Sequence, residues 1–301
     1  MGEIMKHTVT NGIFSLTAES LGAELKSLKD TSGKEYIWNS DPKHWSGSSP
    51  HLFPVVCSLK DDKTVIYDKA YNIEKHGFAR KKEFSVFSQK EDEITFVLKE
   101  EADTLVCYPF KFEFYVTHKV TASGFSTIYK VKNSDNKLMY YSVGGHPAFN
   151  CPMNAGEDFS DYDIEFEKPE TNPVYQSTPD DLGGLLHKDG IKPEFMNINS
   201  FSLNYDIFKL DAVIFERINS NWIKLVNRNT KEGILFSFEN LNSLGIWTPN
   251  VGGAPFVCLE PWTAIPDKDD SSGVFSEKPY ITALEPESEN IYSYKADIIK
   301  G

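Results

Sequence analysis

The chain has 301 residues, of which 40% are hydrophobic and 13% aromatic, and its formal net charge is −13. This acidic balance leaves no basic footprint for a phosphate backbone, so we expect no nucleic-acid partner. No apolar run approaches the length of a membrane span, and the N-terminal stretch MGEIMKHTVTNG lacks the apolar core of a secretory signal, so we expect no membrane partner and a cytoplasmic location. The four cysteines are far apart and form no C-x-x-C pair, which favours reduced thiols.

Alternation of apolar and polar residues with a period of two dominates the first half of the chain. In residues 8–18, TVTNGIFSLTA, the pair Asn11-Gly12 separates two alternating segments, which predicts a β-hairpin. Residues 111–120, KFEFYVTHKV, alternate so that His118 shares a face with phenylalanine and valine side chains, and this predicts a core histidine. Residues 125–133, FSTIYKVKN, repeat the pattern, so we expect adjacent strands here.

Strand-length runs continue into the second half of the chain. They are AVIFERI, NWIKLVNR, EGILFSFEN, LGIWTP and FVCLEPW. Between the two halves, residues 150–193 are rich in proline, glycine and aspartate, and we interpret them as long connections within one domain that spans residues 1–301. Because no long amphipathic helix and no fixed-period repeat occur, the pattern predicts an all-β sandwich or barrel.

The familiar motifs of nucleotide binding and hydrolysis are missing. There is no GxGxxG, no Walker A loop, no HExxH and no GxSxG. What remains is a scattered set of short segments, which are KHGFARK, GGHPAFN, KLDAVIF, LGIWTP and CLEPW. These segments hold the candidate site residues.

Glu260 ends the apolar run PFVCL, where a carboxylate is costly unless it is paired or hydrogen-bonded. An apolar setting also raises the pKa of a carboxyl group toward the range of a useful base. The alternative is a glutamate at a strand end that points into solvent. His146 lies between Gly145 and Pro147, and the proline restricts its backbone to extended conformations. This fixes the direction of an imidazole, although a simple turn histidine has the same local sequence.

The remaining candidates are less distinctive on their own. His76 stands at another strand end before a glycine, and a structural histidine is an equal alternative. Trp247 and Trp262 flank the Glu260 segment, where aromatic rings suit the apolar face of a sugar or a plain core. Because no histidine pair has i, i+4 or H-x-H spacing, we expect no metal unless tertiary structure assembles its site.

Taken in order, these segments resemble the aldose 1-epimerase (galactose mutarotase-like) family. The resemblance runs through YIWNSDPKHW, SSPHLFPVV, HGFAR, GGHPAFN, LDAVIF and LGIWTP to PFVCLEPW, and so covers nearly the whole chain. It implies a large antiparallel β-sandwich with a sugar cleft. We expect no cofactor, because the implied chemistry requires none, and a monomer or homodimer.

The resemblance also implies roles for single residues. Glu260 is expected to be the general base, and His146, as an imidazolium, the general acid. The substrate is expected to be a small-molecule sugar, a free aldohexose whose α and β anomers are interconverted. The residues that would bind this sugar are His76, Arg80, Trp247 and Asp211, with Asp206 as a nearby alternative to Asp211.

One departure from the family pattern concerns an arginine. Many relatives have Gly-Arg after the LFP segment, whereas this chain has Cys57-Ser58, so the role of that arginine is either lost or taken over by Arg80 or Lys60. A hexose-6-phosphate 1-epimerase is an alternative, but phosphate recognition favours arginine forks and only Arg80 lies in a site-like motif. A non-catalytic sugar sensor is another alternative, while glycosidases usually need two carboxylates and only one stands out.

Overall fold

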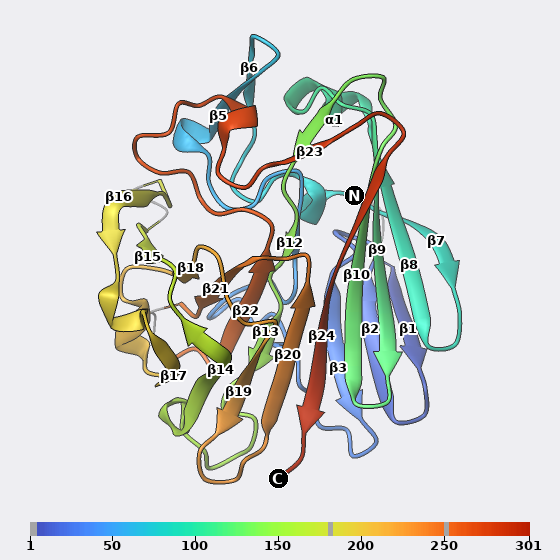
Figure 1. The fold of residues 1–301 in the computed structure, drawn as a ribbon. Helices are drawn as coiled ribbons and strands as arrows, with labels where there is room; N and C mark the ends of the chain where they lie inside the picture. The colour runs from blue at the N-terminus through green and yellow to red at the C-terminus, as the bar shows by residue number, and fades with distance from the viewer. Residues whose placement is uncertain (1–4, 180–182, 250–252) are drawn as a thin grey trace.

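A computed structural model describes residues 5–179, 183–249 and 253–301. Two large antiparallel sheets dominate it (Figure 1). The nine-stranded sheet has, in spatial order, β17 (Ile198–Ser202), β14 (Tyr162–Glu170), β19 (Trp222–Asn227), β20 (Gly233–Glu239), β24 (Glu289–Ile299), β10 (Gly124–Asn133), β9 (Phe112–Thr121), β8 (Glu93–Lys99) and β7 (Ser85–Gln89). The eight-stranded sheet has β16 (Leu186–Ile191), β15 (Val174–Ser177), β18 (Val213–Phe215), β21 (Ser243–Trp247), β22 (Phe256–Trp262), β12 (Gly144–Gly145) and β4 (His51–Leu52), with β13 (Ala148–Asn150) also on β22.

Smaller elements surround the two sheets. They are a three-stranded sheet of β1 (Lys6–Thr10), β2 (Phe14–Glu19) and β3 (Leu25–Asp30), two strand pairs, β5 (Lys63–Ile66) with β6 (Lys69–Asn72) and β11 (Met139–Tyr141) with β23 (Thr282–Leu284), and the helix α1 (Ala102–Cys107). Single 3₁₀ turns are η1 (Lys60–Asp62), η2 (Ala79–Lys81), η3 (Phe159–Asp161), η5 (Pro193–Phe195), η6 (Tyr205–Phe208) and η7 (Phe275–Glu277). None of the helices that the described residues form has the length and apolar character of a membrane span.

The core lies between the two large sheets, as the predicted β-sandwich requires. Phe53, next to β4, stacks on Phe114 of β9 with ring centroids 4.7 Å apart. Phe166 of β14 meets Phe215 of β18 at 5.0 Å. Side chains of the nine-stranded sheet therefore interdigitate with those of the eight-stranded sheet, and this buries the aromatic surplus of the sequence.

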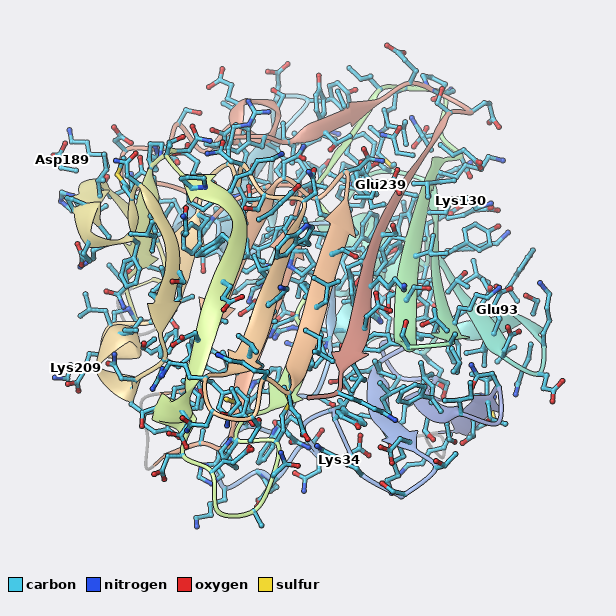
Figure 2. All side chains as sticks on the ribbon, turned by 60° about the horizontal axis from the view of Figure 1, so that its bottom comes forward. Lys34, Glu93, Lys130, Asp189, Lys209 and Glu239 are labelled. Carbon is cyan, nitrogen blue, oxygen red and sulfur yellow. The ribbon has the colours of Figure 1, made fainter. Side chains whose placement is uncertain are left out.

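Strands β9 and β10 show how the period of two builds this layer. Residues with odd numbers from 125 to 131 in β10 are buried, while the even-numbered ones are partly exposed. Figure 2 shows Lys130 of β10 and Glu239 of β20 among the side chains that point out of the sandwich. The predicted alternation of residues 125–133 is therefore confirmed, and so is the Asn11-Gly12 hairpin between β1 and β2.

Residues 150–193 differ from the sequence prediction of long connections, because they contain β14, β15 and β16. The prolines do not prevent this. Pro169 lies beyond the part of β14 that pairs with β19, at the register shift opposite β17, so its missing N–H is not needed there. Pro173 precedes β15. The number of prolines did not predict these strands correctly, because it does not show which positions need a backbone N–H for pairing.

Two histidines are part of the core. His118 of β9 is fully buried, as its alternation predicts, and so is His51 of β4. The Nε2 atoms of both rings lie within hydrogen-bond distance of the same carbonyl, that of Ala23, at 2.8 and 3.1 Å. A carbonyl only accepts, so both rings donate from Nε2. Burial lowers the pKa of both rings, so Nδ1 carries no proton and accepts from the hydroxyl of Thr127 in His118 and of Tyr129 in His51. Each ring is therefore a neutral imidazole with both nitrogens satisfied.

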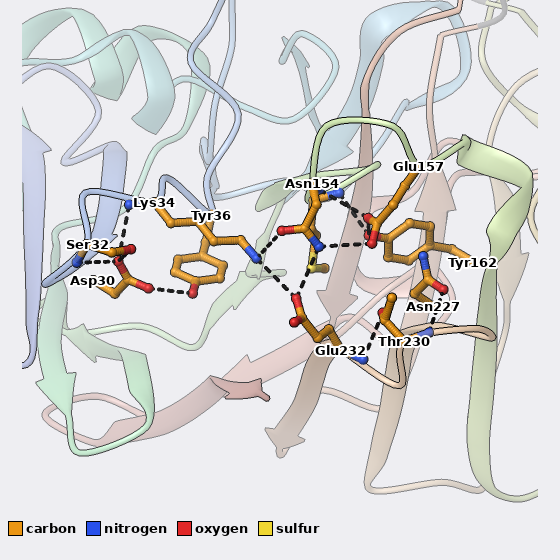
Figure 3. Close-up of polar contacts among 11 residues, drawn as sticks. Asp30, Ser32, Lys34, Tyr36, Asn154, Glu157, Tyr162, Asn227, Thr230 and Glu232 are labelled. Atoms are coloured by element: carbon orange, nitrogen blue, oxygen red, sulfur yellow. Dashed lines mark hydrogen bonds and ion pairs between the residues drawn. The ribbon is translucent and has the colours of Figure 1, made fainter. Parts of the chain in front are cut away.

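A polar network holds the segment after β3 against the nine-stranded sheet (Figure 3). The ammonium group of Lys34 donates to Oδ1 of Asn154 at 2.7 Å and to Glu232 at 3.3 Å. Asn154 in turn donates to Glu232 at 3.1 Å and to Glu157 at 2.9 Å. This network anchors the beginning of the loop that carries Trp45 to the candidate site.

Candidate active site

A cavity of about 310 Å³ opens beside the eight-stranded sheet. The structure brings all six predicted site residues to its wall, and they are His76, Arg80, His146, Asp211, Trp247 and Glu260. Five further lining residues with polar, charged or aromatic side chains are Trp45, Cys57, Lys75, Ser177 and Trp262. Segments that are up to about 200 residues apart in sequence thus converge on one cavity, which no local pattern could reveal.

His146 and Glu260 form the closest pair of titratable groups in the cavity. Nε2 of His146 lies 3.1 Å from Oε2 of Glu260, and both residues are buried. Glu260 is on β22, while His146 follows β12, which pairs with β22 through Gly144 and Trp262. The backbone N–H of His146 donates to the carbonyl of Pro50 at 3.1 Å. Glu260 is therefore held within a strand, while His146 lies in the two-residue connection between β12 and β13, both of which pair with β22.

The two glycines before His146 allow this approach of strands. A Cβ atom on Gly144 would lie 2.5 Å from Cδ1 of Trp262, and one on Gly145 would lie 2.7 Å from the ring of Tyr294. Real Cβ atoms do not come this close to other heavy atoms, so a larger residue at 144 would push β12 away from β22, and one at 145 would push it away from β24 of the other sheet. The glycines of GGHPAFN thus permit close packing next to the candidate acid, and neither has a positive φ.

Aromatic rings enclose the imidazole of His146. Trp45 stacks on it with centroids 4.9 Å apart and an interplanar angle of 28°. Trp247 meets it edge-on at 5.7 Å and 82°. Sequence reasoning gave Trp45 no role, although the segment WNSDPKHW around it is unusually aromatic and polar. The indole N–H of Trp38 donates to the carbonyl of Trp45 at 2.9 Å and so secures its position.

His76 has a defined tautomer. The backbone N–H of Cys57 donates to its Nδ1 at 3.1 Å, and the N–H of His76 donates back to the carbonyl of Cys57 at 3.0 Å. Burial and the positive charge of Lys75 keep the pKa of His76 well below its usual value, so the ring is neutral and its proton is on Nε2. His76 therefore presents an N–H donor, edge-on to His146 with centroids 5.7 Å apart.

The pKa values of the central pair move in opposite directions. Burial raises the pKa of Glu260 well above its usual value; the charge of Asp211 adds to this and that of Lys75 opposes it. Burial lowers the pKa of His146 to about 3, and the charges of Lys75 and Arg80 act in the same direction. Together these two shifts favour a single proton on the pair, held by the carboxyl group and not by the imidazole. The raised pKa of Glu260 agrees with expectation, whereas an imidazolium at rest does not.

Charged groups also line the cavity. Oδ2 of Asp211 accepts a hydrogen bond from Ser177 at 2.9 Å and lies 4.0 Å from the ammonium group of Lys75. Arg80 donates from Nη2 to the carbonyl of Lys75 at 3.0 Å. The alternative aspartate, Asp206, pairs with Lys209 at 3.0 Å and its side chain is 79% exposed. Of the two aspartates, only Asp211 lines the cavity.

Arg80 and Lys60 were the two residues expected to replace the arginine of the resembled family, and only Arg80 lines the cavity. Lys60 donates from Nζ to the carbonyl of Asp269 at 2.8 Å and does not line the cavity. Among the described residues, the basic side chains that line it are Arg80 and Lys75. Lys75 was not predicted, although it directly precedes His76 in KHGFARK.

Comparisons with known proteins find relatives in both sequence and fold. The family model described as aldose 1-epimerase matches residues 5–269. The chain is 32% identical over 295 residues to the chromosomal protein LacX of Lactococcus lactis subsp. lactis, which covers 96% of this chain and 98% of LacX. A galactose mutarotase related enzyme from Lactobacillus acidophilus superposes with a TM-score of 0.89 at 29% identity, covering 98% of both chains. A galactose mutarotase-like protein from Lactobacillus casei superposes with a TM-score of 0.88 at 27% identity, covering 98% of this chain and 100% of that one.

Proposed function

This chain belongs to the aldose 1-epimerase family, and we propose that it interconverts the α and β anomers of a free aldohexose by acid–base opening of the sugar ring. The observation that carries the proposal is the contact of 3.1 Å between His146 and Glu260 in the wall of the cavity. Two groups that share one proton can donate that proton to one oxygen atom of a sugar and remove a proton from a second oxygen atom nearby. The proposed reaction requires nothing else chemically.

The proton balance of the reaction follows from this pair. In the reactive arrangement Glu260 is ionised and His146 is protonated. The pair still holds a single proton, which has moved from the carboxyl group to the imidazole. Glu260 removes the proton of the C1 hydroxyl, the C1–O5 bond breaks, and His146 protonates the ring oxygen. The open-chain aldehyde then rotates about C1–C2, and the ring closes with the two roles exchanged. A positioned acid or base typically contributes about 10²–10⁴-fold to a rate.

The resting pKa shifts fit the intermediate of this cycle. After ring opening the proton is on Glu260 and His146 is neutral, which is the arrangement that burial favours at rest. The bound cyclic sugar must therefore stabilise the ion-pair arrangement, and its C1 hydroxyl and ring oxygen provide hydrogen bonds to both charged groups. In this account the burial of His146 and Glu260 stabilises the open-chain intermediate, to which the ring-opening transition state leads.

The other cavity residues suit a monosaccharide. A volume of about 310 Å³ lies at the small end of the range of about 300–1,000 Å³ for ligand pockets. Trp247 and Trp45 offer apolar faces to the sugar carbons. Asp211 accepts from sugar hydroxyls, while Arg80 and the Nε2–H group of His76 donate to sugar oxygens. These roles are part of the proposal.

A hexose-6-phosphate 1-epimerase is a second candidate, and the presence of Lys75 beside Arg80 in the cavity favours it. Two cationic groups could bind a phosphate in the absence of the family arginine. A non-catalytic sugar sensor is the third candidate, but binding alone has no use for a buried acid–base pair. Polarimetry separates the three.

The test uses freshly dissolved α-D-glucose, α-D-galactose and α-D-glucose 6-phosphate. We expect the protein to accelerate mutarotation of at least one free sugar above the spontaneous rate. Acceleration of the 6-phosphate alone would establish the second candidate in place of the first. Sugar binding in calorimetry without any acceleration would contradict both enzymatic candidates and favour the sensor.

A further inference from the structure

A third ligand-type side chain stands beside the acid–base pair. Cys258 lies two residues before Glu260 on the same face of β22, and it is fully buried. A ring nitrogen of His146, Sγ of Cys258 and a carboxylate oxygen of Glu260 all lie within 4.8 Å of one another. The pairing of Ala148 with Cys258 and of Gly144 with Trp262 frames this cluster, so its three members are fixed by the sheet.

Imidazole, thiolate and carboxylate are the ligands that zinc takes in proteins. Zinc bonds of about 2.0–2.3 Å place tetrahedral ligand atoms roughly 3.3–3.8 Å apart. The His146–Glu260 distance of 3.1 Å and the upper bound of 4.8 Å in the cluster bracket this spacing. Sub-ångström to ångström shifts of side chains would thus complete the coordination.

Charge balance also favours a divalent ion at this place. One thiolate and one carboxylate neutralise an ion of charge +2, and His146 is neutral, so the complex buries no net charge. When the metal–sulfur bond forms, the thiol proton passes to solvent. When the metal–oxygen bond forms, a proton held by the carboxyl group passes to solvent as well. His146 and Glu260 both line the cavity, so a fourth position remains open to water.

We propose that His146, Cys258 and Glu260 bind a thiophilic divalent ion such as Zn²⁺, and that this ion inhibits the protein reversibly. The ion is not a cofactor, because it occupies the lone pairs that the proposed reaction needs for proton transfer. Binding of the ion is independent of the proposed function, whereas inhibition rests on it.

The test of binding uses Co²⁺, whose thiolate complexes absorb in the near ultraviolet through sulfur-to-metal charge transfer. We expect this absorption on titration of the metal-stripped protein, and its displacement by Zn²⁺. The Cys258→Ala variant should lose it. Cys57→Ala is the matched control, because Cys57 is a buried thiol in the cavity wall but outside the cluster, and this variant should keep the absorption. No absorption in the unaltered protein, or unchanged absorption in Cys258→Ala, would overturn the site.

The test of inhibition is polarimetry with Zn²⁺, followed by removal of the ion with a chelator. Mutation of residues that only hydrogen-bond to metal ligands weakens metal binding by about 10–100-fold, and loss of a ligand itself has at least this effect. Loss of the Cys258 ligand should therefore raise the inhibitory Zn²⁺ concentration by at least about tenfold, with each variant compared with its own activity in chelator. Equal sensitivity of Cys258→Ala and the unaltered protein would overturn the proposed mode of inhibition. A protein that binds Co²⁺ with the expected absorption but has no epimerase activity would contradict the proposed function and leave the metal site supported.

Discussion

Cys57 and His76 are joined by two hydrogen bonds, from the N–H of Cys57 to Nδ1 of His76 at 3.1 Å and from the N–H of His76 to the carbonyl of Cys57 at 3.0 Å. Both residues have positive φ angles, 57° and 67°, a conformation that side chains other than glycine rarely adopt. The two hydrogen bonds offset this strain. They also leave Nε2–H as the group that His76 offers to the cavity.

The first prediction concerns this donor. In His76→Gln the amide nitrogen can take the place of Nε2–H, whereas in His76→Asn the shorter amide reaches only the position of Nδ1. A hydrogen bond of this kind contributes about 0.5–1.5 kcal/mol, so His76→Asn should lose about 2–10-fold more kcat/KM than His76→Gln in polarimetry. Equal losses in both variants would show that Nε2–H does not contact the sugar.

The second prediction concerns the stacking of Trp45 on His146. Trp45→Phe keeps an aromatic face, whereas Trp45→Ala removes it and admits water to the imidazole. Aromatic stacking contributes about 0.5–1.5 kcal/mol beyond burial, so we expect Trp45→Ala to lose roughly 2–10-fold more kcat/KM than Trp45→Phe. The measurement is polarimetric kcat and KM for both variants. If Trp45→Ala retains full activity, the ring has no part in the site.

The third prediction concerns the pH dependence of the rate. The proposed cycle needs one proton on the His146–Glu260 pair. The pair loses this proton as pH rises through the raised pKa of Glu260, and it gains a second one as pH falls toward the pKa of His146, about 3. After subtraction of the spontaneous rate, kcat/KM should decline as pH falls toward 3, and decline again as pH rises through a pKa that lies well above 4.5. A decline centred near pH 4.5 would show instead that Glu260 has an ordinary pKa.

The fourth prediction concerns stability in acid. The pKa of His118 is lowered to about 4 by burial, so below pH 6.5 the unfolded chain binds a proton that the folded chain does not bind. The free energy of unfolding should therefore fall as pH decreases from 6.5 to 4, by an amount on the order of 3 kcal/mol from this group. Urea unfolding at several pH values measures the slope. His118→Gln, which cannot titrate, should be less stable at pH 7 but have a flatter slope, and an equal slope would exclude this source.

Much of the fold follows from local patterns. The alternation in residues 111–133 predicts β9 and β10 because each strand has one face in the core and one outside it. The prediction missed β14, β15 and β16, where prolines suggested loops. A proline is harmless where its N–H has no partner strand, and a sequence does not show which positions these are.

The residues of the candidate site also differ in whether the sequence predicts them. Glu260 and His146 have local signals, an acid in an apolar run and a histidine held by proline, which the family pattern sharpened. Lys75 and Trp45 have no such signal. Their positions depend on tertiary contacts, such as the hydrogen bond from Trp38 to the carbonyl of Trp45. The cluster with Cys258 likewise exists only because β13 pairs with β22.

The central claim is that Glu260 and His146 exchange protons with a sugar. The most direct measurement is polarimetric mutarotation by Glu260→Gln, with His146→Asn beside it and with sugar affinity followed by calorimetry. The introduced glutamine and asparagine side chains are similar in shape to those they replace, but they cannot perform the proton transfer. We predict that each variant loses about 10²–10⁴-fold in kcat while its affinity for sugar changes only a few-fold. Full activity in Glu260→Gln would contradict the account.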